Sequence, residues 1–361
     1  MWILIAKRLL WAVPTLLVIS VVGFTLMRFK VDTPPLRIPN PLHALTQQGA
    51  THLTLLPRLR FSQPVDPLAE LKSNPQISQA AIAKETQRLG LDQPLWVQYT
   101  RWLRHALKGD WGTSFAGEEV GWLIATRARN TLLLNVATLL VTWLLAIPLG
   151  VLAAQRAGGM LDRSLVALAS AGMAMPSFVL ALVLGVWAVH TGLLPYGGLT
   201  SPTYALLSPV GKVGDVLSHL ALPVLVLSVG GLASLQRQMR GNLLEVLGAD
   251  YVRHAHAKGL PALMVLYKHA VRNAINPLIT LFGFELAGLL SGAILVETVL
   301  GFPGLGLLAY EAALKGDTNL VMAVLILSAA LLVAGNVVAD VLLALSDPRI
   351  RHSMGSSAHA T

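Results

Sequence analysis

The sequence contains no cysteine in its 361 residues. Disulfide bonds, thiol catalysis and zinc sites built on cysteine are therefore excluded. Charge is also scarce, because only 12% of the residues are Asp, Glu, Lys or Arg, about half of the ~25% that is usual in soluble domains. A chain with so little charge does not have the composition of an ordinary soluble domain.

Three motifs that would indicate an enzyme are also missing. The chain has no G-x-x-x-x-G-K-[ST] loop for a nucleotide phosphate, no H-E-x-x-H zinc motif and no G-x-S-x-G nucleophile turn. Gly301–Gly306 is rich in glycine, but no Lys-Ser/Thr pair follows it. We interpret it as a tight turn that re-enters the outer vestibule, and we expect the chain to bind no cofactor and to hydrolyse no ATP itself.

Long apolar runs are what the sequence has instead, since 54% of the residues are hydrophobic and the mean hydropathy is +0.64. Each run is close to the ~20 residues that a helix needs to cross a bilayer. The runs predict an all-α transmembrane fold with six spanning helices. They lie at about Leu9–Met27, Thr131–Ala154, Leu165–Val189, Val216–Leu235, Leu278–Leu300 and Leu320–Leu345.

Basic residues cluster in the loops on one side of these spans, although the net charge of +9 could by itself suggest nucleic acid. Such clustering follows the positive-inside rule, so we expect no nucleic-acid partner and place both termini in the cytoplasm. The predicted divisions are an N-terminal span at 1–30, an extracytoplasmic insert at 31–130, a core of five spans at 131–346 and a cytoplasmic tail at 347–361. The core contains a cytoplasmic loop at 236–277.

The insert has two parts. Residues from about Asp32 to Pro75 show little periodicity and predict an irregular segment. From Ser78 to Lys108 the apolar residues recur at helical spacing, and Pro94 is expected to open a second short helix. Tyr and Trp residues in this part favour a packed cap at the membrane–water interface.

The loop at 236–277 is too long for a simple connection. Gly241–Ala257 has a helical pattern with Leu244, Leu247, Tyr251 and Ala255 on one face; Gly259 is expected to end it, and Leu260-Pro261 to start another helix. The second helix is expected to carry an apolar stripe of Leu263, Leu266, Tyr267, Ala270, Val271 and Ala274. The small residues Ala255 and Gly259 would let another backbone approach closely. Physical reasoning leaves two hypotheses open, a docking surface for a cytosolic protein and an amphipathic helix on the inner leaflet.

Ordered motifs across nearly the whole chain, except about Val31–Gln76, point to one family. They are Lys7-Arg8-Leu9-Leu10, Leu89-Gly90-Leu91-Asp92-Gln93-Pro94, Gly109-Asp110-Trp111-Gly112, Asn130-Thr131-Leu132, Ile147-Pro148-Leu149-Gly150, Met175-Pro176-Ser177-Phe178, Asp250-Tyr251-Val252-Arg253, Ala257-Lys258-Gly259-Leu260, His269 to Pro277, Val296-Glu297-Thr298, Pro303-Gly304-Leu305-Gly306 and Asp347 to Arg351. The chain resembles the dipeptide/oligopeptide (nickel) permeases of binding-protein-dependent ABC transporters. The Glu that names the EAA loop of such permeases is absent, and Arg253 and His254 stand near its place.

This resemblance implies a type I ABC importer (MetI-like) permease in a bacterial inner (plasma) membrane, which moves peptides or similar small solutes. Its implied partners are a second homologous permease in a heterodimer, two ATPase subunits that bind ATP and Mg, and an extracytoplasmic substrate-binding protein. The implied ATPase-coupling residues are Asp250, Tyr251, Arg253, Ala255, Ala257, Lys258, Gly259 and Leu260. Candidate hinge or pathway residues are Pro148, Pro176, Pro223, Pro277 and Glu285.

An ion-coupled secondary transporter is the alternative. Glu285 and Glu297 lie in or at the end of the fifth span, and ionisable residues in spans are often functional. We expect Glu285 to pack inward against a polar partner, and Glu297, His190 and His219 to lie at the interface. The sequence shows no inverted repeat of the kind that many carriers have.

Overall fold

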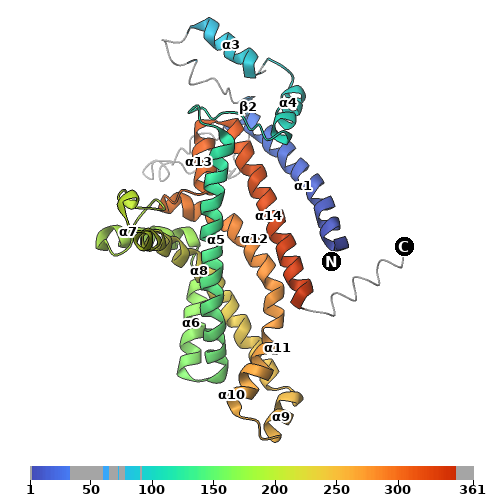
Figure 1. Ribbon diagram of the computed structural model, residues 1–361, viewed down its shortest axis with the longest axis vertical. Coiled ribbons are helices and arrows are strands. Elements are labelled where there is room, and N and C mark those ends of the chain that lie inside the picture. The colour runs from blue at the N-terminus through green and yellow to red at the C-terminus, as the bar shows by residue number, and fades with distance from the viewer. Residues whose placement is uncertain (1, 33–59, 65–71, 73–77, 90–91, 347–361) are drawn as a thin grey trace, which may run out of the picture.

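The computed structural model describes residues 2–32, 60–64, 72, 78–89 and 92–346. Most of them form a bundle of long helices, with short helices at both of its ends (Figure 1). The long helices are α1 (Trp2–Arg28), α5 (Val120–Gln155), α8 (Pro209–Leu247), α12 (Asn276–Leu300) and α14 (Thr318–Ser346). The shorter elements of the bundle are α6 (Met160–Ala174), α7 (Ser177–Thr191), the 3₁₀ turn η1 (Tyr204–Leu206) and α13 (Leu305–Lys315).

These helices occupy the six predicted spans. Among the described residues, α5, α8 and the Thr318–Val338 part of α14 are each long and apolar enough to cross a membrane, and two bent helix pairs could add two more. In α1, Leu10–Leu26 is a shorter apolar stretch. Helix α5 begins at Val120, well before the predicted start at Thr131.

The third predicted span is not a single straight helix. Helices α6 and α7 meet at an angle of 100°, and α7 leaves the bundle sideways (Figure 1). Proline disfavours helical geometry in the residue before it, and Met175 accordingly adopts extended angles of φ −92° and ψ 120°. Pro176 itself lies just before the first residue of α7. The third predicted span, at about Leu165–Val189, therefore corresponds to two helices with a sharp bend between them.

Part of the outer insert is described. It includes α3 (Gln79–Leu89) and α4 (Leu95–Leu107), and Pro94 caps α4 as the sequence predicts. Strands β1 (Phe29–Asp32) and β2 (Arg60–Pro64) form an antiparallel ribbon, with Asp32 opposite Arg60 and a bulge between Phe29 and Val31. The ribbon is an addition to the all-helical prediction. The rest of residues 31–76, and the tail at 347–361, lie outside the described residues.

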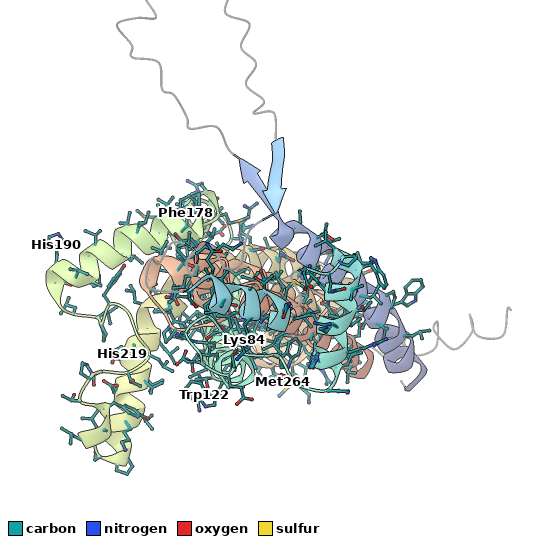
Figure 2. All side chains as sticks on the ribbon, turned by 90° about the horizontal axis from the view of Figure 1, so that it is seen from above. Lys84, Trp122, Phe178, His190, His219 and Met264 are labelled. Carbon is teal, nitrogen blue, oxygen red and sulfur yellow. The ribbon has the colours of Figure 1, made fainter. Side chains whose placement is uncertain are left out.

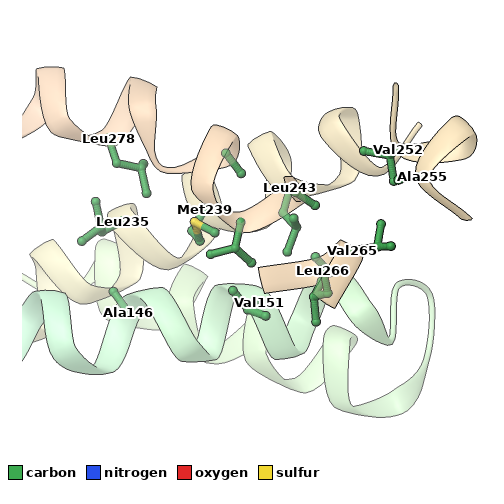
Figure 3. Packing of buried hydrophobic residues seen from close by; sticks show 14 residues of the cluster. Ala146, Val151, Leu235, Met239, Leu243, Val252, Ala255, Val265, Leu266 and Leu278 are labelled. Atoms are coloured by element: carbon green, nitrogen blue, oxygen red, sulfur yellow. The ribbon is translucent and has the colours of Figure 1, made fainter. Parts of the chain in front are cut away.

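The core is layered along the bundle, and its tightest contact is between α5 and α8. Gly150 of α5 permits this approach, because a Cβ at that position would lie 2.6 Å from Cβ of Met239. At the end that carries α9 (Asp250–Ala257), buried residues of α5, α8 and α12 continue into the loop after α8 (Figure 3). At the opposite end, Val120, Leu123 and Ile124 of α5 pack against Leu305 and Leu308 of α13.

Candidate functional sites at the two ends of the bundle

The loop after α8 folds into a compact projection at one end of the bundle (Figure 1). Its elements are α9, α10 (Ala262–Met264), the π-helix η2 (Val265–Val271) and α11 (Arg272–Ala274). The sequence predicted one helix over Gly241–Ala257, but α8 ends at Leu247 and α9 starts at Asp250. Ala249 between them is extended, with ψ 146°, so that α9 turns away from the axis of α8.

Helix α9 is rooted by two buried side chains, Val252 and Ala255, which are 1% and 8% exposed. Figure 3 shows both at one end of the row of buried residues that includes Val265 and Leu243. The expectation that Ala255 offers a close-approach surface to another protein is therefore wrong, because the chain's own core already covers it. The small side chain instead lets α9 pack against its own bundle.

The other predicted coupling residues mostly point outward. Arg253, Ala257, Lys258 and Gly259 are exposed, and Leu260 is half-buried against the core. Asp250 and Arg253 form a loose pair at 3.7 Å with both side chains exposed. Tyr251 is 45% exposed, and its hydroxyl accepts a hydrogen bond of 3.1 Å from Asn273. The outer face of α9 is thus cationic and largely free of bonds within the described chain.

Gly259 ends this element for a conformational reason. Its φ is +77°, which side-chain-bearing residues rarely adopt, and no atom would lie within 4 Å of an added Cβ. The turn brings Leu260 back so that its N–H lies 3.4 Å from the Ala255 carbonyl oxygen. Glycine is required here by the backbone angle, and no other part of the chain that the structure describes approaches an added Cβ closely.

The helix expected after Pro261 is partly a π-helix. Leu266, Ala270, Val271 and Ala274 of the predicted apolar stripe are buried, but Leu263 and Tyr267 are 70% and 58% exposed. The wider π-turn rotates the stripe, which explains why a regular helical period assigned these two residues wrongly. Asn242 of α8 donates a 3.1 Å hydrogen bond to the Ala274 carbonyl and ties this segment back to the bundle.

The four candidate hinge prolines lie in different settings. Pro176 lies at the bend between α6 and α7. Pro148 and Pro223 lie inside the continuous helices α5 and α8, and Pro277 is in the first turn of α12. Glu285 is in α12, but its side chain lies outside the described part of the structure.

At the opposite end, Glu297 of α12 is fully buried. The sequence predicted only a position at the end of the span and not that the protein would enclose this side chain. Its carboxylate accepts hydrogen bonds from the Thr131 hydroxyl at 2.7 Å and from the N–H groups of Gly306 and Leu307 at 2.6 and 3.3 Å. The Thr131 hydroxyl in turn accepts the Leu305 N–H at 2.8 Å. Thr131 and Glu297 together bind the first three N–H groups of α13.

This arrangement replaces a local helix cap. The N-cap residue of α13 is Gly304, which has no side chain to bind those N–H groups. A carboxylate at a helix N-terminus is also favoured by the helix dipole. Asn130 donates to the Pro303 carbonyl at 2.8 Å, so two neighbouring residues of α5 hold the turn. We call Asn130, Thr131, Glu297 and Pro303–Leu307 the anchored turn.

The glycines of the anchored turn are required by close packing. An added Cβ on Gly304 would overlap the Glu297 carboxylate, and one on Gly306 would overlap the backbone of Ile294. Beyond α13, the buried Asp317 accepts the Phe115 N–H at 2.7 Å and the Leu320 N–H at 3.1 Å. The available sequence signal was Glu297 followed by Gly304-Leu305-Gly306. This pattern alone does not predict that the carboxylate binds the backbone of that run.

The two histidines considered for a carrier lie apart. His219 is buried in α8, with Nδ1 2.8 Å from the Asp215 carbonyl oxygen, whereas His190 is exposed at the end of α7 (Figure 2). Among the described residues, no group of three or more His, Asp or Glu residues could hold a metal ion.

Comparison with known proteins gives a consistent result. Residues 146–352 match the family of binding-protein-dependent transport system inner membrane components. The chain is 39% identical over 292 residues to an oligopeptide transport system permease protein, AppB, of Bacillus subtilis, covering 80% of this chain and 90% of that protein. It is 36% identical to the oligopeptide permease OppB of Mycobacterium tuberculosis, over 82% and 92% of the two chains. It is 34% identical to the dipeptide permease DppB of Escherichia coli, over 80% and 91%.

A solved structure supports the fold. A chain of an inward-facing MetNI methionine ABC transporter superposes with a TM-score of 0.51 at 19% identity, over 63% of this chain and 97% of that one. The MetI-like type I importer fold expected from the sequence is confirmed.

Proposed function

We propose that the chain forms part of the pathway for peptides or similar small solutes. The chain belongs to the family of binding-protein-dependent transport system inner membrane components and is a permease subunit of an ABC importer. The names of its relatives, which are oligopeptide and dipeptide permeases, support this class of substrate. The solutes would be delivered by an extracytoplasmic substrate-binding protein.

The proposed assembly contains a second, homologous permease as a heterodimeric partner and two ATPase subunits. The ATPase subunits bind ATP and Mg, and this chain itself hydrolyses no ATP. The lack of a phosphate-binding loop in the sequence supports this division of labour.

The observation that carries the proposal is the construction of α9. Its inner side is rooted in the core by Val252 and Ala255, while Arg253 and Lys258 are exposed on its outer side. A short helix of this kind can transmit force, because movement of a docked ATPase would be passed through packed side chains to α8 and α12. ATP binding would thus favour one of two states of the bundle, as alternating access requires. Pro148, Pro176, Pro223 and Pro277 are the proposed bending points.

We further propose that both termini and α9 are cytoplasmic and that the anchored turn is at the outer end. The basic residues beside the predicted inner ends of the spans support this orientation. Since the chain has no cysteine, a single Gln63→Cys substitution gives one reactive thiol in β2. Labelling by a membrane-impermeant reagent is expected in intact cells, and labelling that occurs only after the cells are opened contradicts the orientation.

Reconstitution in liposomes tests the function. The complete complex should accumulate a labelled peptide only when ATP and the binding protein are present, and the purified chain alone should neither hydrolyse ATP nor accumulate solute. The ion-coupled carrier predicts the opposite. Accumulation by the chain alone under a proton gradient, abolished by Glu285→Gln, would replace the importer by a carrier.

A further inference from the structure

Helix α4 has an unusual position beside the first span. Its Tyr99 hydroxyl lies 2.7 Å from the Ser20 hydroxyl of α1. The Phe24 ring lies 5.5 Å from Tyr99 and 6.4 Å from Trp102. Ser20 and Phe24 are 2% and 5% exposed. One face of α4 is therefore fixed against α1.

This contact places α4 at a definite depth. In the sequence, the apolar run of α1 ends at Met27 and Arg28 follows, so Ser20 lies seven residues, or about 10 Å along the helix, before the end of the run. Tyr99 therefore meets α1 alongside apolar residues and not beyond them. This level lies within the last two turns of the apolar run, next to the end where the headgroups begin.

A second face of α4 is apolar and uncovered. Trp96 is 70% exposed and Leu107 is 79% exposed, and at helical spacing they lie on the same side as the half-buried Leu103. A ridge of this kind would be costly in water but suits the acyl-chain side of the interface, where tryptophan is enriched.

A third face is cationic. Arg101, Arg104 and Lys108 recur at i, i+3 and i+7 and, with Val97 and Thr100, line a hollow of about 320 Å³. The neighbouring His105 is already bonded to Asp110 at 2.9 Å, which lowers the pKa of that carboxyl group. Within the described ranges, no carboxylate forms an ion pair with these three cations.

We propose that α4 is an interfacial helix whose Arg101, Arg104 and Lys108 bind the phosphate of a membrane phospholipid while Trp96 and Leu107 contact its acyl chains. The combination selects a lipid over an acidic protein surface, because the apolar ridge and the cations lie side by side at bilayer depth. The leaflet is the outer one under the proposed orientation, and only that detail rests on the proposed function. The bound lipid would hold α4 and, through Ser20 and Phe24, the outer half of α1.

The depth is tested with a fluorophore. In the complete complex in nanodiscs of phosphatidylcholine and phosphatidylglycerol, Leu107→Cys carries an environment-sensitive dye on the only thiol of this chain. We expect blue-shifted emission that brominated lipid quenches and aqueous iodide does not. The control is Lys84→Cys in α3, which is exposed and lies beyond α4 (Figure 1), and its dye should respond to iodide. If iodide quenches the dye on Leu107→Cys and brominated lipid does not, the proposal is overturned.

The phosphate contact is tested with Arg101→Gln, Arg104→Gln and Lys108→Gln, separately and together. Retained phospholipid is counted by native mass spectrometry after stepwise detergent washing, and affinity should fall about fivefold per removed cation. Unchanged lipid retention in the triple variant overturns the proposal. Loss of affinity for the binding protein with unchanged lipid would assign the face to an acidic protein instead. Neither measurement requires transport, so the importer function can fail or hold independently.

Discussion

The two ends of the bundle each carry a short helix next to a glycine turn, but the helices are held by opposite means. At one end, α13 starts in the anchored turn, where the buried Glu297 and Thr131 bind its N–H groups. At the other end, α9 is held by the apolar contacts of Val252 and Ala255, and its charged groups are exposed. At the anchored turn the polar groups form hydrogen bonds within the chain, whereas the charged side chains of α9 are exposed.

This difference indicates how the two ends work. A buried network of hydrogen bonds loses much free energy if any member moves alone, so the parts of α5, α12 and α13 that meet in the anchored turn should move as one body. The projection that carries α9 is packed against the core but exposes Arg253 and Lys258, which suits the proposed docking of an ATPase subunit. The following predictions test this contrast, from the largest expected effect to the smallest.

Glu297→Ala should be the most damaging change. It leaves the Thr131 hydroxyl and the N–H groups of Gly306 and Leu307 without their acceptor, at a cost of about 1–3 kcal/mol for each buried donor. The melting temperature and yield of the purified complex should fall sharply. Glu118→Ala, which removes an exposed carboxylate, is the control, and equal melting temperatures for the two variants would contradict the anchoring role.

Gly304→Ala should destabilise the same end by up to about 3 kcal/mol, because the added methyl group overlaps the Glu297 carboxylate. Thermal unfolding of the purified complex measures this. The matched variant is Gly230→Ala in α8, where no atom lies within 4 Å of the added Cβ. A helix gains stability from this change in general, so Gly230→Ala should be neutral or slightly stabilising, and the contrast fails if both variants melt alike.

Val252→Ala should weaken the root of α9 by about 1.5 kcal/mol, from the loss of two buried methyl groups. The expected result is a complex that still assembles but couples poorly, so that substrate-stimulated ATP hydrolysis falls more than basal hydrolysis. Leu263→Ala removes a larger side chain that is 70% exposed and should leave coupling intact. Full stimulation in Val252→Ala would show that α9 does not transmit force through its root.

Arg253→Ala and Lys258→Ala should have the smallest effect on stability, below about 0.5 kcal/mol, because both residues are exposed and the pair of Arg253 with Asp250 is loose. Their effect should be on the affinity for the ATPase subunits, and it should shrink as salt is raised. Co-purification of the ATPase at low and high salt measures it. Undiminished affinity in the double variant would remove the cationic face from the docking surface.

The sequence predicted the element-level features well where a local pattern was sufficient. The apolar runs located the membrane helices, Pro94 located the start of α4, and Gly259 located the end of α9. Each of these depends on length, on a fixed backbone angle or on a turn residue, which neighbouring residues determine.

Predictions that depended on which face meets which neighbour were weaker. Ala255 was expected to meet another protein, but the chain's own core covers it, and Tyr267 was assigned to the buried face, but it is exposed in the π-helix. The role of Glu297 could not be predicted from the sequence. One of its partners is Thr131, which lies 166 residues earlier, and the others are N–H groups in the first turn of α13, which have no partner within that helix.

The sequence by itself therefore determined the membrane class, the family and the places where helices start and stop, because hydrophobic length and turn chemistry act locally. Only the tertiary structure decided that α7 leaves the bundle, that Glu297 is buried as the cap of α13, and that α4 lies against α1. These outcomes are set by contacts between distant segments, where one bend or one buried carboxylate changes which side chains face lipid, core or partner.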